Sequence, residues 1–356
     1  MGNERTDEPR PIRPGEELDA QKLGAYLASV LPDFAGPWSI TQFAAGHSNL
    51  TYLVASPARE VVLRRPPFGN RVKSAHDMGR EFRVLAKLWP VYAPAPRPFH
   101  YCEDDSVIGA PFYVMERRSG LILRSPLPRT ANFEPATMRQ ICLAFIDNLA
   151  ALHTLDYEAA GLGELGKPEG YVARQVSGWS RRYQDAKTEE LDEMEMASQW
   201  LNQHLPAEGR PGLVHNDYKF DNIAVDPTEP TRIVAVFDWE MATIGNPLMD
   251  LGTTLAYWIE AKDVALLPAS TVGPTNLPGC LTRMELIERY TAKAGCDVSN
   301  LLFYYAFGLF KIAVIIQQIF ARFQRGATKD PRFANLGERV RLMGHEILRV
   351  VSAGVF

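Results

Sequence analysis

A ten-residue segment near the middle of the chain constrains the fold more than any other feature. It runs Leu-Val-His-Asn-Asp-Tyr-Lys-Phe-Asp-Asn over residues 213–222 and contains the spacing His-x-Asp-x-x-x-x-Asn. A short apolar stretch, a turn with Asp and Pro at 226–230 and a second apolar stretch at 233–237 follow, and Asp238 ends the second stretch. This order predicts a polar loop, a β-hairpin and an aspartate at the end of the returning strand.

The polar side chains of this pattern meet the requirements of phosphoryl transfer. Asp217 would face an attacking hydroxyl, while Asn222 and Asp238 would hold the magnesium ions that bridge nucleotide phosphates. Lys219 would neutralise charge on the transferred group. In the alternative interpretation these residues stabilise a turn, Asp238 caps a helix and Lys219 is an exposed loop lysine. The hairpin and the aspartate that follows it favour the catalytic interpretation.

Together with this segment, five others resemble the aminoglycoside phosphotransferase superfamily of small-molecule kinases, in the branch fused ahead of acyl-CoA dehydrogenases or encoded alone in bacteria. These segments are 46–52, 62–67, 80–82, 238–252 and 316–322. The resemblance implies an α+β, two-lobed protein-kinase-like fold, with a small antiparallel-sheet lobe and a larger, mostly helical lobe. It also implies ATP as phosphoryl donor and Mg²⁺ as cofactor, and it leaves the acceptor unspecified.

The expected elements follow the order of this fold. Strands are expected at 38–43, 51–55, 61–65, 97–102 and 111–116, with helices at 18–31 and 77–89. Further helices are expected at 138–153, 252–262, 283–294, 301–325 and 335–351, and a helical pair is inserted at 171–205. We therefore divide the chain into a flexible tail (1–20), a small nucleotide-binding lobe (21–115) and a large helical lobe with the catalytic loop and acceptor site (116–356).

The loop between the first two strands is expected to cover the nucleotide phosphates. Ser48 and Asn49 lie in this loop and can meet phosphate oxygens, although a Gly-Ser-Asn turn is also common in simple hairpins. Ala45 stands where the branch usually has the first of two adjacent glycines. The sequence therefore predicts phosphate contacts here from the position of the loop between the strands.

The third strand is expected to form the floor of the nucleotide site. Side chains alternate along a strand, so Val62 would touch the adenine and Arg64 the phosphates, with Glu81 as the ion partner of Arg64. The alternatives are a surface Arg–Glu pair, or Arg65 in place of Arg64 if the register shifts by one residue. Where the lobes join, the backbone of Met115 and Glu116 would bond the adenine edge.

Several neighbours distinguish this chain from protein kinases. His215 is expected to brace the catalytic loop, and the resemblance implies that Asp250 supports it from beneath. Asp-Trp-Glu at 238–240 replaces Asp-Phe-Gly, and an Ala-Pro-Glu sequence is missing, so a protein-kinase activation segment is disfavoured. A catalytically silent pseudokinase with a regulatory or scaffold role is the remaining alternative, and the intact catalytic and metal-binding residues argue against it.

The acceptor is expected to be a small molecule with a hydroxyl group, bound under the inserted helices. Arg174, Arg181 and Arg182 could meet an anionic acceptor such as a CoA-linked hydroxy acid. The acidic run at 189–195 could equally meet a polycation such as an aminoglycoside. Both runs are also typical of solvated helix faces, so the sequence leaves the two acceptor classes open.

The composition argues against other partners. A net charge of −4 and a pI near 6.0 give no electrostatic footprint for nucleic acid. The apolar stretch at 301–320 contains Lys311, so we expect a buried helix and no membrane association. The four cysteines form no CxxC pair, which is typical of reduced thiols, and we expect a cytoplasmic protein without a secretory signal.

Overall fold

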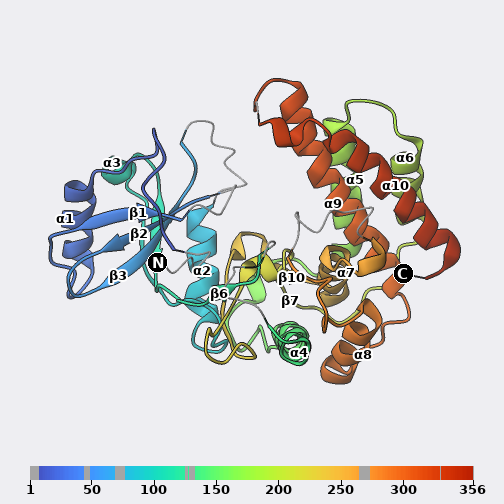
Figure 1. Cartoon of the computed structure of the whole chain (residues 1–356), viewed down its shortest axis with the longest axis horizontal. Coiled ribbons are helices and arrows are strands. Elements are labelled where there is room, and N and C mark those ends of the chain that lie inside the picture. The colour runs from blue at the N-terminus through green and yellow to red at the C-terminus, as the bar shows by residue number, and fades with distance from the viewer. Residues whose placement is uncertain are drawn as a thin grey trace.

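The computed structural model describes residues 8–43, 49–68, 77–124, 127, 133–263, 273–328 and 330–355. The described elements form a sheet-containing lobe from the N-terminal part of the chain and a mostly helical lobe from the remainder (Figure 1). The prediction of an α+β fold with a small antiparallel sheet and a larger helical part is therefore confirmed.

The small lobe is built on a five-stranded antiparallel sheet in the order β1-β2-β3-β5-β4. Its strands are β1 (Ser39–Gln42), β2 (Leu50–Ala55), β3 (Glu60–Arg65), β4 (Pro98–Cys102) and β5 (Phe112–Met115). Three helices accompany them, α1 (Ala20–Val30), α2 (Met78–Leu88) and the short α3 (Asp105–Ile108). Helices α1 and α2 lie on either side of the sheet (Figure 1).

Alternation along β3 decides which side chains face the large lobe. Val61 and Leu63 are buried in the cluster that contains α1, whereas Val62 is buried in the cluster that contains α2. Arg64 therefore follows Val62 on the side of α2, as expected from the period of a strand. Arg65 lies on the other face, where its guanidinium bonds the carbonyl oxygens of neighbouring loops and stacks on a phenylalanine ring.

The described part of the expected N-terminal tail is attached to this sheet. The main chains of Arg10 and Gln42 bond each other in both directions, at 2.7 and 2.9 Å. The hydroxyl of Tyr52 donates to the carbonyl oxygen of Glu16 at 2.8 Å. The prediction of a flexible tail therefore does not hold from Arg10 onward, because these bonds extend the edge of the sheet.

The large lobe consists mainly of helices. They are α4 (Pro135–His153), α5 (Tyr171–Ala186), α6 (Asp192–Gln203), α7 (Pro247–Tyr257), α8 (Arg283–Ala294), α9 (Leu301–Gln324) and α10 (Leu336–Ala353). Two small sheets carry the catalytic segment, one pairing β10 (Thr243–Gly245) with β7 (Gly212–Val214), and one with β6 (Leu121–Ile122), β8 (Ile223–Val225) and β9 (Ile233–Val236) in the order β6-β8-β9.

Two features of this lobe differ from the expectations. Helix α7 begins at Pro247 rather than near residue 252, because Asn246 caps it by accepting the main-chain N–H of Leu248 at 2.9 Å. Strands β6, β7 and β10 were not expected, since each has only two or three residues and is stabilised by pairing with a distant segment.

Helix α9 is the central helix of the large lobe and contacts α5, α6, α7 and α10. It is the one helix among the described residues that is long and apolar enough to cross a membrane, and most of it is buried inside the protein. Its contact with α7 depends on two glycines. A Cβ atom on Gly308 would lie 2.4 Å from the carbonyl oxygen of Gly252, and one on Gly252 would lie 2.2 Å from the carbonyl oxygen of Tyr304.

We expect Gly308→Ala to lower the thermal unfolding midpoint, because the added methyl group would force α7 and α9 apart at a cost of about 1–3 kcal/mol. Gly178→Ala in α5 is the matched control. Its Cβ would make only an ordinary contact at 3.6 Å, so higher helix propensity should stabilise the protein by roughly 0.5–1 kcal/mol. Circular dichroism melts of both variants test this, and a Gly308→Ala variant as stable as the parent would contradict the tight crossing.

Candidate active site

The catalytic loop after β7 is fixed by one buried carboxylate. Asp250, in α7, accepts the main-chain N–H of His215 at 2.6 Å and that of Asn216 at 2.9 Å. It also bonds Nε2 of His153 at 3.2 Å. Burial acts to raise the pKa of Asp250, but the bond from His153 and the neighbouring imidazole and main-chain N–H of His215 lower it. The supporting role expected for Asp250 matches these contacts.

His215 ties the loop to the strand that carries the next functional residue. Its Nε2 lies 2.8 Å from the carbonyl oxygen of Phe237, and its Nδ1 accepts the main-chain N–H of Asp217 at 3.3 Å. With both ring nitrogens engaged in this way, the imidazole braces the loop and does not face the acceptor side. The position of Asp217 relative to β9 follows from this brace.

The carboxylate of Asp217 is surrounded by donors. Nζ of Lys219 lies 2.8 Å from both carboxylate oxygens, and Nδ2 of Asn222 donates to the main-chain oxygen at 2.8 Å and to Oδ2 at 2.9 Å. Burial acts to raise the pKa of Asp217, but the charges of Lys219 and Lys311 lower it below its ordinary value. The structure therefore holds Asp217 as an oriented, ionised carboxylate.

Asn222 and Asp238 meet at one end of the β8–β9 hairpin. Asn222 ends a 3-10 turn (η2, Phe220–Asn222), and its carbonyl oxygen accepts the N–H of Phe237 at 2.9 Å. Asp238 follows directly, in a left-handed conformation with φ 67° and ψ 60°. A non-glycine residue in this region carries strain of order 1–3 kcal/mol and is common at functional sites. Since Asn222 uses its amide nitrogen on Asp217, its side-chain oxygen is the atom available for a metal ion.

Arg64 connects the two lobes at this point. Its Nε lies 3.2 Å from Oε2 of Glu81 in α2, and its Nη2 lies 3.0 Å from Oδ1 of Asp238. The expected ion pair with Glu81 is therefore present, and Arg64 rather than Arg65 reaches the cleft. Burial acts to lower the pKa of Arg64, but the carboxylates beside it raise that pKa well above its ordinary value.

Several carboxyl groups surround the single guanidinium of Arg64. Glu81 is almost fully buried, and burial raises its pKa despite the charge of Arg64. Burial and the neighbouring Asp238 raise the pKa of Glu240 to about 8. This charge balance fits a divalent cation at Asn222 and Asp238. Among the described residues no group of three or more His, Cys, Asp and Glu side chains forms a metal site by itself, as expected where nucleotide phosphates supply further ligands.

Of the other residues predicted to bind the nucleotide, Ser48 lies outside the described residues. Asn49 donates to Oε2 of Glu240 at 2.7 Å, across the lobes. Val62 and Met115 are register partners on β3 and β5, both buried. The N–H of Glu116 bonds the carbonyl oxygen of Arg97 at 2.8 Å, so that N–H is not available to an adenine ring.

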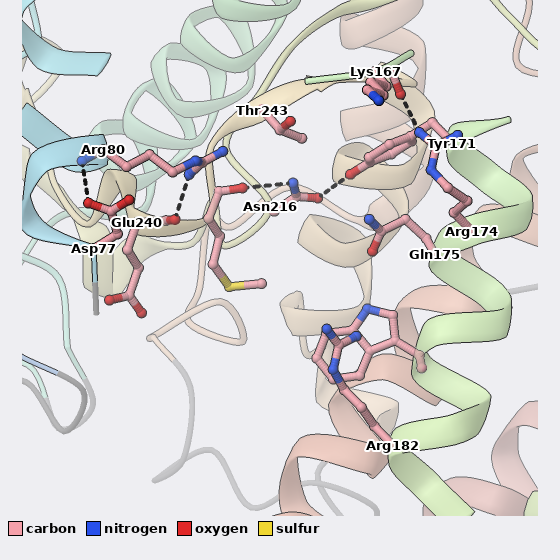
Figure 2. A pocket seen from close by; sticks show the side chains of 12 residues that line it. Asp77, Arg80, Lys167, Tyr171, Arg174, Gln175, Arg182, Asn216, Glu240 and Thr243 are labelled. Atoms are coloured by element: carbon pink, nitrogen blue, oxygen red, sulfur yellow. Dashed lines mark hydrogen bonds between the residues drawn. The ribbon is translucent and has the colours of Figure 1, made fainter. Parts of the chain in front are cut away.

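A pocket of about 500 Å³ opens beside the catalytic loop, between α2 and α5 (Figure 2). Asn216, Glu240 and Met241 form its inner side, and Tyr171 and Trp179 contribute aromatic rings. Its basic lining residues are Arg80, Lys167, Arg174 and Arg182, and its acidic ones are Asp77 and Glu240. The side chains of Arg174 and Arg182 extend from α5 along one wall (Figure 2).

The acidic run of the inserted helices faces a different part of the protein. Glu189 pairs with Arg341 at 3.1 Å, and Glu193 pairs with His345 at 3.3 Å. Both partners belong to α10, whereas none of the acidic residues at 189–195 lines the pocket. Arg174 and Arg182 of the basic run line this pocket, whereas Arg181 and the acidic run do not.

The family follows from comparison with known proteins. Residues 39–284 match the model of the family described as "Phosphotransferase enzyme family". The chain belongs to this phosphotransferase family. Acyl-CoA dehydrogenase family member 10 of Mus musculus is 36% identical over 338 residues, which are 94% of this chain and 31% of the relative. The chain thus spans about a third of that relative.

Solved structures agree with the family. A Ralstonia eutropha protein, classed by inference as an aminoglycoside phosphotransferase, superposes with a TM-score of 0.80 at 32% identity, over 95% of this chain and 99% of its own. An aminoglycoside phosphotransferase solved as a ternary complex with ADP and hygromycin B shares the fold, with a TM-score of 0.56 at 16% identity over 88% and 94% of the two chains.

Sequence patterns did not indicate a functional role for several residues that lie at this site. Arg80, on α2, donates to the carbonyl oxygens of Glu240 at 2.9 Å and Ala242 at 2.5 Å, which ties the small lobe to the loop after β9. Tyr171 donates to the side chain of Asn216 at 3.0 Å. For Lys311, the sequence signal of a possible role was the presence of a cation inside an apolar helix.

We expect Arg64→Met to weaken Mg-ATP binding at least about tenfold, or roughly 1.4 kcal/mol, because Glu81 and Asp238 lose the cation between them. Arg65→Met is the control, since Arg65 is a buried arginine on the opposite face of β3. Isothermal titration calorimetry, at a temperature where circular dichroism shows both variants folded, gives the comparison. Equal affinity in Arg64→Met and the parent would reject this role for Arg64.

Proposed function

We propose that this phosphotransferase is a small-molecule kinase that moves the γ-phosphoryl group of ATP to a hydroxyl of its acceptor, in the cytoplasm. The observation that carries the proposal is the contact of Arg64 with both Glu81 and Asp238. This contact joins the lobes in the arrangement that kinases need for turnover. The ADP in the ternary complex of the hygromycin-binding neighbour supports nucleotide use.

The nucleotide would lie in the cleft between the lobes. Val62 and Met115 would cover the adenine, and Arg64 would bind the phosphates. Asn222 and Asp238 would hold Mg²⁺, which would supply positive charge against the phosphate groups. The surplus of carboxylates around Arg64 supports this assignment, because a cation would offset it.

Asp217 would orient the acceptor hydroxyl and accept its proton. Phosphoryl transfer passes through a loose transition state, so positioning and charge stabilisation matter more than a strong base. A carboxylate held ionised by Lys219 and Asn222 suits that task. Lys219 would also offset charge on the transferred group, because its ammonium group lies within 2.8 Å of both oxygens of Asp217.

We further propose that the acceptor carries an anionic group, as a hydroxyacyl-CoA does. Four basic side chains line the pocket, and none of the four forms an ion pair with a carboxylate within the described residues. Charge-assisted bonds to phosphate or carboxylate groups are the strongest use of such residues. The name of the mouse relative, an acyl-CoA dehydrogenase family member, agrees with an acceptor of this kind.

We expect Asp217→Asn to lower turnover by roughly a hundredfold or more while Mg-ATP affinity stays unchanged, because the amide can orient the hydroxyl but cannot accept its proton. Asp226→Asn, in the hairpin turn, is the control and should keep parental turnover. A coupled ADP-release assay measures both variants over a panel of hydroxylated metabolites. Full activity in Asp217→Asn rejects the role, and an inactive parent that binds ATP favours the pseudokinase.

The charge of the acceptor can be tested on adjacent arginines. Arg182 lines the pocket and Arg181 does not, although both lie in α5. We expect Arg182→Glu to raise KM for a hydroxyacyl-CoA at least about tenfold, with KM for ATP unchanged, because the substitution reverses one charge of the wall. Arg181→Glu should leave both constants unchanged. Turnover of aminoglycosides in preference to hydroxyacyl-CoAs would overturn the anionic acceptor.

A further inference from the structure

We propose that Lys311 is a positioning residue of the reaction, which fixes the main chain of Asn216 and thereby the orientation of Asp217. The proposal rests on the kinase function above, because it assigns Asp217 to the acceptor hydroxyl. Nothing in the sequence motifs assigns a role to α9, which otherwise serves as the central apolar helix of the large lobe.

The environment of Lys311 is unusual for a structural lysine. Its side chain is 3% exposed, on a helix whose residues are mostly apolar. Burying an ammonium group is costly unless it is paired. Over the part of the chain that the structure describes, Lys311 has no carboxylate within ion-pair distance. Its hydrogen bond goes instead to the carbonyl oxygen of Asn216, at 2.5 Å.

The acceptor of this bond is a strained residue. Asn216 has a φ of 67°, and contacts on all sides hold it there. Its N–H bonds Asp250, its side chain accepts from Tyr171 at 3.0 Å and donates to the carbonyl oxygen of Met241 at 3.0 Å, and its carbonyl accepts from Lys311. Left-handed conformations of non-glycine residues persist only where the surroundings hold them in this way.

The bond reaches Asp217 through the peptide plane. The carbonyl group of Asn216 and the N–H of Asp217 belong to one planar unit, so fixing the carbonyl fixes the direction of the N–H. That N–H donates to Nδ1 of His215. Lys311 and His215 therefore hold the same peptide group from opposite ends, and the carboxylate of Asp217 starts from that group.

The charges around Lys311 make its state depend on pH. Burial lowers its pKa to about 8; Asp217 from the loop and Asp250 from α7 favour the ammonium form, and Lys219 from the loop and Arg182 from α5 oppose it. The ring of Trp179 in α5 lies 5.7 Å away. Because the folded-state pKa is below that of a free lysine, the ammonium form is half lost at about pH 8 and is lost completely well above it. The bond to Asn216 then loses its charge assistance, so turnover should fall as pH rises through this range.

The experiment compares Lys311→Met and Lys311→Arg with the control Gln317→Met. Gln317 is also buried on α9 and also donates to a main-chain carbonyl, but that carbonyl belongs to Ala186 at the end of α5. Hydrogen exchange of the segment 212–222 and Mg-ATP affinity are measured in all variants without an acceptor. Turnover is measured from pH 6.5 to 9.5 on a hydroxyacyl-CoA, or on another hydroxylated metabolite of the panel that the parent phosphorylates.

In Lys311→Met we expect exchange in the catalytic loop to accelerate and turnover to fall, each by about tenfold or more, with Mg-ATP affinity within about twofold of the parent. Lys311→Arg should restore loop protection and move the alkaline fall of turnover to higher pH, because arginine stays charged. Gln317→Met should leave loop exchange unchanged even if it lowers the melting temperature.

The proposal is overturned if the loop in Lys311→Met exchanges as slowly as in the parent, or if Gln317→Met loosens it equally. It is also overturned if the parent and Lys311→Arg share one pH profile of turnover and of loop exchange, after correction for the intrinsic rate of amide exchange. This second comparison decides the matter if Lys311→Met does not fold. A parent that phosphorylates no acceptor would refute the kinase function, whereas loop exchange would still decide the role of Lys311.

Discussion

The site depends on one arginine placed between carboxylates of two lobes. Arg64 comes from β3, Glu81 from α2, and Asp238 follows β9. Carboxylate oxygens of Glu81 and Asp238 lie 3.2 and 3.0 Å from nitrogens of the Arg64 guanidinium. Glu240 is a third carboxyl group near this guanidinium. Burial and the neighbouring Asp238 raise the pKa of Glu240. The same feature therefore joins the two lobes and brings several carboxyl groups around one guanidinium.

A second set of buried hydrogen bonds holds the main chain of the catalytic loop. Asp250 holds two successive N–H groups of the loop, and Lys311 holds the carbonyl oxygen of the second residue, Asn216. Helices α7 and α9 supply these two groups and cross closely at Gly252 and Gly308. The close packing of α7 and α9 thus sets the geometry of a loop that neither helix contains. A closely packed interior is hardly compressible, so the position of each helix fixes the position of the groups it holds.

The pocket beside the catalytic loop takes its lining residues from elements outside the hairpin. Asp217, Asn222 and Asp238 belong to the hairpin region, whereas α5 supplies Arg174 and Arg182 to the pocket and α2 supplies Arg80. An inserted helix can change its lining residues without disturbing the hairpin, so the acceptor can vary while the transfer chemistry stays. Site chemistry rather than fold must therefore carry any statement about the acceptor.

Local sequence was sufficient for much of the fold. Periodicity located the sheet strands and long helices, because those elements bury a regular face. The spacing of Asp217, Asn222 and Asp238 predicted a shared site, and the structure brings these residues together at the hairpin. The start of α7 was missed although Asn246 and Pro247 carried a cap signal. The strands of two or three residues, β6, β7 and β10, could not be found, since pairing with distant segments alone stabilises them.

What the sequence by itself determined was the chemistry of the loop and the alternation of side chains along β3, because both follow from residue spacing along one segment. The choice between Arg64 and Arg65, the orientation of the basic and acidic runs, and the contact of Lys311 with Asn216 were decided only by tertiary structure. Each depends on contacts between residues far apart in the chain: Arg64 and Asp238 are 174 positions apart, Glu189 and Arg341 are 152 apart, and Asn216 and Lys311 are 95 apart. Such contacts depend on how helices pack, and packing is a property of the folded core that no local pattern records.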